Sequence, residues 1–387
     1  MSLGVYLHLP FCVRRCRYCA FYSGEPLSRR GELVEQLLTE LSLRAGEAVG
    51  PVGSVYFGGG TPSLLHPDQL HRLLVAVLAT WGEVGEPEVT LELNPADRLP
   101  LVALRAAGFN RLSVGVQALD DPLLAALGRR HSADQARATV SAAASAGFSR
   151  VSADLLIGLP QTHPDTLARW VFELVSSGAT HLSLYSLELH PGSELAAACA
   201  AGRFRPASED LEASQFQSVI RAAEACGMEA YEVSNTALAG HRCRHNLNYW
   251  QGGTYLGLGP GAHSFLPRSG PWGTRCWNAP QLSPYLTALK RGQLPPGENE
   301  VLTREQALLE TLFLQLRCSS TLSPTALAVA FDLHRENTVH AFSALTEQGF
   351  FSVQPAGALC PTWEALRRAD ALALALHGRL LAGQPVA

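Results

Sequence analysis

Six short runs rich in β-branched and aliphatic residues alternate with amphipathic segments through the first half of the chain. The runs predict strands at 3–8, 54–57, 89–93, 111–115, 150–157 and 181–187. The segments between them predict helices at 31–45, 67–80, 98–107, 120–127, 133–146 and 164–177. Such alternation indicates a parallel sheet with right-handed crossovers. Because six units fall short of the eight that close a barrel, we expect an α/β partial barrel with its polar chemistry at the strand C-terminal ends.

The pattern changes after residue 190. Helices are predicted at 192–202 and 208–226, whereas residues 240–280 are rich in Gly, Trp, Tyr and His without a helical period. A Gly/Pro stretch at 292–299 is the predicted linker to a smaller, mainly helical, winged-helix-like C-terminal domain. The helices predicted in that domain are 303–317, 323–331, 337–348 and 363–383, with a short strand near 350–353. The expected division is a barrel over 1–240, a Gly- and aromatic-rich extension over 241–295, and a helical domain over 296–387.

Composition and cysteine usage exclude several classes of function. The net charge is −4, so we expect no broad basic surface and no nucleic-acid partner. No run of about 18 uncharged apolar residues predicts a spanning helix, and the opening residues MSLGVYLHLPFC do not resemble a secretory leader. Nine cysteines is an odd number for a disulfide framework, and three of them lie between residues 12 and 19. This usage predicts a reduced, cytoplasmic protein with one thiolate site.

The three crowded cysteines follow the first predicted strand. Cys12, Cys16 and Cys19 are spaced C-x3-C-x2-C. Three thiolates in one short loop can hold a [4Fe-4S] cluster and leave one iron open to a small molecule. The alternative is a zinc site, which needs a fourth ligand from elsewhere, such as His8. A disulfide is a weaker alternative, because three is an odd number of thiols.

Polar residues also end the strands that follow. The second predicted strand runs into Gly58-Gly59-Gly60-Thr61-Pro62, where missing side chains let the backbone approach a ligand or simply form a tight turn. Glu92, Gln117 and Asp154 each place one polar group on a later, otherwise apolar strand. Buried carboxylates need partners, so each could be a satisfied ion pair or cap. Three polar side chains on successive strands, two carboxylates and one amide, favour a shared ligand instead, and Arg129 could pair with that ligand or with Asp154.

The run YLHLPFCVRRCRYCAF resembles the cluster loop of the radical S-adenosylmethionine (SAM) superfamily. It is most similar to the branch that holds coproporphyrinogen dehydrogenases and heme chaperones, and the similarity is clear over about residues 3–280. The resemblance implies a partial (β/α)6 radical SAM barrel with a [4Fe-4S] cluster on Cys12, Cys16 and Cys19. It also implies SAM contacts at the matching positions, with Arg130 adjacent to the assigned arginine. These positions are Tyr6, Tyr18, Gly59, Gly60, Thr61, Glu92, Gln117, Arg129 and Asp154.

Three features favour the heme-chaperone side of this branch. The dehydrogenase pattern has a further cysteine two residues after the third cluster cysteine, and that position here is Phe21. The dehydrogenase also carries an extension before its first strand, whereas this chain reaches its first predicted strand almost at once. Residues 245–250, His-Asn-Leu-Asn-Tyr-Trp, fit the HNxxYW motif associated with heme binding in the chaperones. One residue departs from the chaperone pattern, which usually has Asp where this chain has Ala20.

His245 is therefore the predicted heme ligand. A neutral imidazole can bind heme iron, and Tyr249 and Trp250 can offer flat apolar surface to a porphyrin. The alternative is a hydrogen-bonded core cluster around the same histidine. Cys243 could be a second ligand or a buried thiol, and His263 in a nearby Gly-rich turn is assigned no role. The remaining cysteines are predicted to be core residues: Cys199, Cys226, Cys276, Cys318 and Cys360.

The resemblance implies a cytoplasmic heme chaperone that binds heme, a [4Fe-4S] cluster and SAM and delivers heme to respiratory heme proteins. The implied partners are heme, those client proteins and a second copy of the chain in a homodimer, with membrane contact only through the clients. The alternative function is that of an oxygen-independent coproporphyrinogen III dehydrogenase, which decarboxylates its substrate oxidatively to protoporphyrinogen IX. A zinc-bound scaffold without redox chemistry is a third hypothesis.

Overall fold

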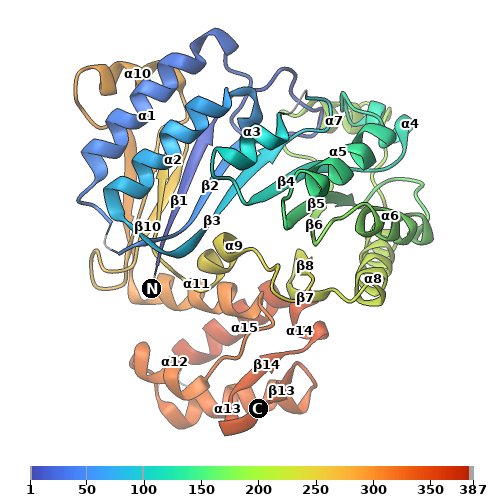
Figure 1. Cartoon of the computed structure of the whole chain (residues 1–387). Coiled ribbons are helices and arrows are strands. Elements are labelled where there is room, and N and C mark those ends of the chain that lie inside the picture. The colour runs from blue at the N-terminus through green and yellow to red at the C-terminus, as the bar shows by residue number, and fades with distance from the viewer. Residues whose placement is uncertain (1, 49, 98–99, 383–387) are drawn as a thin grey trace.

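A mixed sheet of twelve strands forms the frame of the molecule. The computed structural model describes residues 2–48, 50–97 and 100–382 (Figure 1). The strand order is β12-β11-β10-β9-β1-β2-β3-β4-β5-β6-β8-β7, so the sheet has two edges and the barrel stays open. The central parallel strands are β1 (Leu3–Leu9), β2 (Val52–Gly59), β3 (Glu83–Leu93), β4 (Arg111–Gln117), β5 (Arg150–Ile157) and β6 (His181–Ser186). The predicted partial barrel of six parallel strands is confirmed.

Helices follow the strands and cover the sheet, and Figure 1 shows α1 and α2 lying along β1, β2 and β3. Their apolar faces and the strands form one continuous core. A capping box at Ser132 and Gln135 begins α5, which satisfies N–H groups that the first turn leaves without helical partners. The helices of this part are α1 (Arg30–Arg44), α2 (Pro67–Trp81), α3 (Leu101–Ala106), α4 (Asp121–Ala126), α5 (Ala133–Ser145), α6 (Pro164–Ser176), α7 (Glu194–Ala200) and α8 (Glu209–Ala225).

Both ends of the sheet extend beyond the predicted strands. Strand β9 pairs parallel to β1, and the others pair antiparallel. The added strands are β7 (Glu229–Glu232), β8 (Asn235–Ala237), β9 (Tyr255–Leu258), β10 (His263–Leu266), β11 (Thr274–Asn278) and β12 (Gly297–Val301). Two short helices, α9 (Arg244–Trp250) and α10 (Leu282–Lys290), lie among them. The prediction that 240–280 has no helix is therefore wrong at α9, and the predicted linker at 292–299 is in part an edge strand.

A second apolar cluster holds the C-terminal lobe together, drawn in orange and red in Figure 1. The cluster runs from Leu302 to Leu376 and includes one residue of the sheet extension, Phe265. Its elements are α11 (Arg304–Leu316), α12 (Pro324–Ala330), α13 (Arg335–Glu347), β13 (Phe351–Val353), β14 (Leu359–Pro361), α14 (Trp363–Arg367) and α15 (Ala369–Ala382). Helices followed by a β13–β14 hairpin fit the winged-helix-like expectation. The helix predicted at 363–383 is divided in two, and its residue 383 lies outside the described residues.

The ends of the central strands position the candidate site. Because the strands are parallel, the segments that follow β1, β2, β3 and β4 leave the sheet at the same edge. These segments carry the cysteine loop, Thr61 and Asn94, and Gln117 is the last residue of β4. The helix predicted at 98–107 is shorter, because α3 begins only at Leu101; residues 98–99 lie outside the described part of the chain.

Candidate cluster and cofactor site

The cysteine loop is held in place by Arg17, which lies between Cys16 and Cys19. Its backbone N–H donates to Leu127 O at 3.1 Å, and its backbone carbonyl accepts from Leu195 N at 2.8 Å. Its guanidinium donates to Ala126 O at 2.9 Å. These bonds tie the loop to the end of α4 and the start of α7. The three loop cysteines are half-buried and carry free thiols, so they remain accessible to a ligand.

A chain of hydrogen bonds joins two of these cysteines through three strand ends. Thr61 Oγ1 contacts Cys12 Sγ at 3.8 Å and accepts from Asn94 Nδ2 at 2.9 Å. Arg129 donates to Asn94 Oδ1 at 2.6 Å, to Gly115 O at 2.6 Å and to Cys16 Sγ at 3.3 Å. The predicted residues Thr61 and Arg129 are thus brought together with the cysteines. Asn94 was missed, although its place directly after the third predicted strand was a usable signal.

The guanidinium of Arg129 lies at the cysteine loop. It donates to Cys16 Sγ at 3.3 Å and lies near the Tyr18 hydroxyl. Iron in such clusters is bound by cysteine thiolates. Burial raises the pKa of Tyr18, so its phenol stays neutral beside the loop. The donor set therefore fits a [4Fe-4S] cluster held by Cys12, Cys16 and Cys19.

The zinc alternative finds no preformed geometry. Among the residues that the structure describes, no three His, Cys, Asp or Glu side chains are grouped as the ligands of a single metal ion. Thiolates that bind separate irons of a cluster do not need to meet at one point. His8, the suggested fourth zinc ligand, has both ring nitrogens engaged, Nε2 with Tyr22 O at 2.9 Å and Nδ1 with the Tyr6 hydroxyl at 3.2 Å.

The glycines after β2 are required by close packing. A Cβ on Gly60 would collide with the backbone carbonyl of Phe11, and one on Gly59 would lie 2.6 Å from the His8 ring. Gly59 also has φ of +108°, which disfavours any side chain. Gly58 lies against the ring of Tyr6. These contacts pack the turn closely against β1 and against Phe11, the residue that precedes Cys12.

Two carboxylates, one on β3 and one on β5, have raised pKa values. Burial, with the nearby Asp154 carboxyl adding to it, raises the pKa of Glu92 to about 7, and Glu92 accepts from Gly59 N at 3.0 Å. Burial also raises the pKa of Asp154 to about 6, although the Ser113 hydroxyl donates to it at 2.9 Å. Gln117, on the strand between them, has φ of +67°, a costly conformation for a residue with a side chain. Such strain and shifted pKa values are typical of binding sites.

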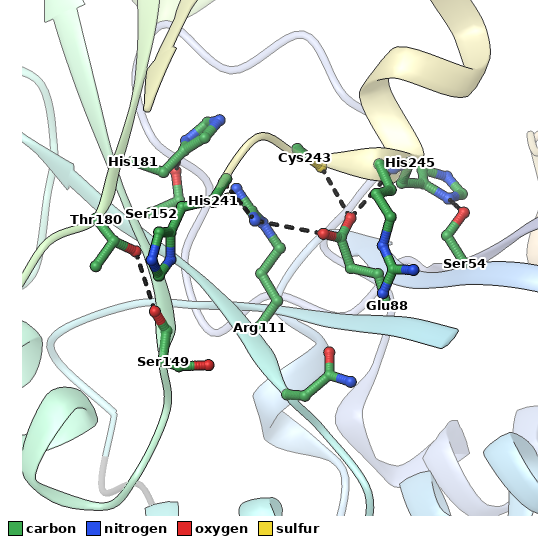
Figure 2. A network of polar contacts seen from close by, with 12 residues as sticks. Ser54, Glu88, Arg111, Ser149, Ser152, Thr180, His181, His241, Cys243 and His245 are labelled. Atoms are coloured by element: carbon green, nitrogen blue, oxygen red, sulfur yellow. Dashed lines mark hydrogen bonds and ion pairs between the residues drawn. The ribbon is translucent and has the colours of Figure 1, made fainter. Parts of the chain in front are cut away.

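His245 lies apart from this edge, in a buried polar network (Figure 2). Its Nδ1 is 2.8 Å from Ser54 Oγ in β2, and its Nε2 is 2.8 Å from the Tyr249 hydroxyl. Its backbone N–H donates to Glu88 at 3.1 Å. Burial lowers the pKa of His245 to about 3, so the ring is neutral. Cys243 is buried beside it, with its pKa raised to about 12 by burial. Heme ligation by His245 stays a prediction, and it requires one of these ring bonds to break.

A cavity of about 630 Å³ opens beside the cysteine loop. Its lining begins at Ala20, Phe21 and Tyr22, which directly follow Cys19, and continues along β10 and β11 to helix α11. Tyr6 and Tyr249, which the sequence singled out for SAM and heme respectively, both line it. The volume is in the range of cavities that hold small molecules.

A family model described as the radical SAM superfamily matches residues 6–172. The heme chaperone HemW of Mycobacterium tuberculosis is 36% identical over 353 residues, which cover 89% of this chain and 89% of that protein. This chain belongs to the HemW family of radical SAM proteins.

Other relatives are similar to this chain over most of their length. HemW of Bacillus subtilis is 31% identical over 83% of this chain and 84% of its own. The mitochondrial radical S-adenosyl methionine domain-containing protein 1 of Bos taurus is 35% identical over 97% of this chain and 88% of its own. Coproporphyrinogen III oxidase (HemN) of Escherichia coli, a solved radical SAM enzyme, superposes with a TM-score of 0.80 at 20% identity. That match covers 97% of this chain and 90% of the HemN chain and shows that the two share a fold.

In the described part of this HemW-family chain, no helix is long and apolar enough to cross a membrane. The family model covers the cysteine loop and the strand ends through β5. It therefore implies a [4Fe-4S] cluster and SAM at this edge of the sheet. The roles of the individual SAM residues stay predictions.

The stability of this HemW-family protein without cofactors should fall as pH rises, because of Glu92. Its pKa is 4.5 ordinarily and about 7 in the folded state, so folding takes up a proton between these values. Stability from this group is complete below pH 4.5 and is lost as pH rises through about 7. We expect Glu92 to lower the free energy of unfolding by on the order of 3 kcal/mol between pH 4.5 and 8.

Urea denaturation at pH 5 and pH 8 checks this result. Glu92→Gln should flatten the pH dependence and gain stability relative to the unchanged protein at pH 8. Glu298→Gln, which alters an exposed carboxylate in β12, is the matched control. An equal pH dependence in the Glu92 variant would show that this carboxyl is not the group responsible.

Proposed function

We propose that this protein is a heme chaperone, which binds heme beside a [4Fe-4S] cluster and SAM and delivers the heme to respiratory heme proteins. The observation that carries the proposal is the similarity to proteins named heme chaperone HemW, at 36% identity across 89% of the chain. The cavity that borders the cysteine loop supports it, because it offers aromatic surface for a large flat ligand.

The cofactor residues have distinct roles in this proposal. Cys12, Cys16 and Cys19 would hold the cluster, and Arg129 would donate a hydrogen bond to the Cys16 sulfur. SAM would be held by the backbone at Gly59 and Gly60 and by the polar side chains around them: Thr61, Glu92, Gln117, Arg129 and Asp154, with Tyr6 and Tyr18 as aromatic neighbours. When bound, the cluster supplies an electron donor next to SAM. The carboxylates would pair with the ammonium and ribose hydroxyl groups of SAM.

The dehydrogenase activity is the rival function. The shared fold with HemN favours neither function, since one fold can serve both. Phe21 occupies the position where the dehydrogenase pattern has a further cysteine, and this supports the chaperone. The respiratory clients, a homodimer, membrane contact through clients and a cytoplasmic location accompany the proposal as predictions.

Heme titration into anaerobically reconstituted protein tests the proposal. We expect a Soret band that saturates at a fixed ratio of heme to protein. In parallel, the same preparation is incubated with SAM, a reductant and coproporphyrinogen III, and we expect no protoporphyrinogen IX. Formation of that product would establish the dehydrogenase instead. Heme absorbance that grows without saturation would show that heme binding is not specific, and this result would contradict the chaperone function.

A further inference from the structure

The cavity beside the cysteine loop has two walls that come from distant parts of the chain. Strands β10 and β11 supply His263, Phe265, Arg275 and Trp277 on one side. Helix α11 of the C-terminal lobe supplies Glu310 and Leu314 on another. The cavity is therefore complete only when the sheet extension and the C-terminal lobe are both folded.

One histidine in this region has an imidazole free to bind a metal. His263 is exposed and lines the cavity, and within the described part of the chain neither of its ring nitrogens has a hydrogen-bond partner. His8 also lines the cavity, but both of its ring nitrogens are engaged by Tyr6 and Tyr22. His245 is buried, both of its ring nitrogens are engaged, and it does not line the cavity.

The ring of His263 is also held in a defined plane. It stacks on Trp277 with the ring centroids 5.6 Å apart and an interplanar angle of 19°. A ligand ring that is fixed before binding loses less entropy when it binds iron. Trp277 thereby acts as a positioning residue for the imidazole.

The rest of the cavity matches the shape and charge of a porphyrin. Tyr249 and Tyr255 meet edge to face at 4.6 Å and present apolar aromatic surface. Arg275 is the arginine among the lining residues; it forms an ion pair with Glu310 and lies over the Phe265 ring at 5.6 Å. A guanidinium has five N–H donors, so it can hold Glu310 and a second carboxylate together.

We propose that heme binds in this cavity with His263 as its axial ligand and with Arg275 paired to a propionate. This assignment rests on the proposed heme-binding function and specifies where the heme lies. The HNxxYW motif then contributes through Tyr249, which lines the cavity, while His245 holds Tyr249 in place from the buried side.

Binding of heme and of metal-free protoporphyrin IX to cluster-reconstituted, full-length protein distinguishes ligation of the iron from packing against the porphyrin. His263→Ala should shift the Soret band and weaken heme binding by about tenfold or more, because the iron loses its protein ligand. The same variant should keep its affinity for metal-free protoporphyrin IX, followed by fluorescence, within about twofold, since that ligand has no iron. Added imidazole should restore the heme spectrum. His190→Ala, which removes a partly exposed imidazole outside the cavity, is the matched control.

The propionate contact has its own test. Arg275→Gln should weaken heme and metal-free protoporphyrin IX by a similar factor of about tenfold, because both carry propionates. It should not change binding of the heme dimethyl ester, whose propionates are uncharged. Equal loss with the ester would show that the arginine acts only on packing and would remove the propionate assignment.

The outcomes keep this inference apart from the proposed function. If the unchanged protein gives no saturable heme band, the chaperone function fails. If the unchanged protein binds heme and His263→Ala binds it equally well with the same spectrum, the His263 assignment fails and the chaperone function stands. If only His245→Ala loses the band while keeping its cluster and its circular dichroism spectrum, the ligand is His245.

Discussion

Replacing Arg111 by methionine should lower the free energy of unfolding by about 3–5 kcal/mol, because it leaves a carboxylate buried without its cation. Arg111 on β4 and Glu88 on β3 form an ion pair at 3.4 Å, and their side chains are 2% and 0% exposed. Glu88 also accepts from the backbone N–H of His245 and from the Cys243 thiol (Figure 2). The loss should therefore reach the start of α9 as well.

Urea denaturation measures the Arg111 effect, and the chain offers a matched control. Arg72→Met breaks the ion pair between Arg72 and Glu35, whose side chains are each 54% exposed, and should cost far less stability because solvent screens that pair. Combining Arg111→Met with Glu88→Gln should recover part of the loss, since the buried charge is then removed. Equal destabilisation by the Arg111 and Arg72 variants would mean that burial does not strengthen the inner pair.

Replacing Cys16 by alanine should abolish cluster binding. The iron content after anaerobic reconstitution should fall from about four irons per chain to nearly none, because two thiolates cannot hold the [4Fe-4S] cluster. Cys16 is the best single choice, since its sulfur is the one that Arg129 contacts at 3.3 Å. Iron and sulfide analysis, with the visible absorption that bleaches on reduction, gives the result.

Cys226→Ala is the control for the cluster prediction. Cys226 caps the C-terminal end of α8 and belongs to the packing around the core, not to the cysteine loop. Its variant should bind iron and sulfide as the unchanged protein does. A Cys16 variant that keeps a full cluster would contradict the three-cysteine assignment, and zinc uptake without colour would support the scaffold hypothesis.

Much of the central fold could be predicted because its strands are buried on both faces. β4, for example, is buried along nearly its whole length, and its apolar run is visible in the sequence. Apart from β9, which pairs parallel to β1, the strands that were missed are short and antiparallel, and some, such as Asn235–Ala237 and Gly297–Val301, are weakly apolar. Their pairing depends on neighbours far along the chain, which local sequence patterns do not contain. Helix α9 was missed because its seven residues are too few for a helical period.

Some residues of the candidate site could also be predicted from the sequence, and others could not. Thr61 could be proposed because it lies in a recognisable glycine-rich motif at a strand end, and Arg129 because it follows the Leu127-Gly128 pair after a predicted helix. Asn94 contacts Thr61 and Arg129, which lie 33 and 35 positions away in the sequence. The structure was therefore needed to show that Asn94 links these two residues. For His245, the motif was recognisable in the sequence but the surroundings of the side chain were not. Whether its ring faces a cavity or a buried serine depends on how α9 packs against β2.

An open sheet leaves a row of unpaired backbone groups at each margin, and β12 is one of those margins. Glu298 and Glu300 occupy alternate positions of this short strand, and its first residue is Gly297. Antiparallel docking of a second copy along β12 would bring these negative charges together, which disfavours the contact. Self-association of this protein should therefore use another surface, and the margin itself is protected against aggregation into extended fibres.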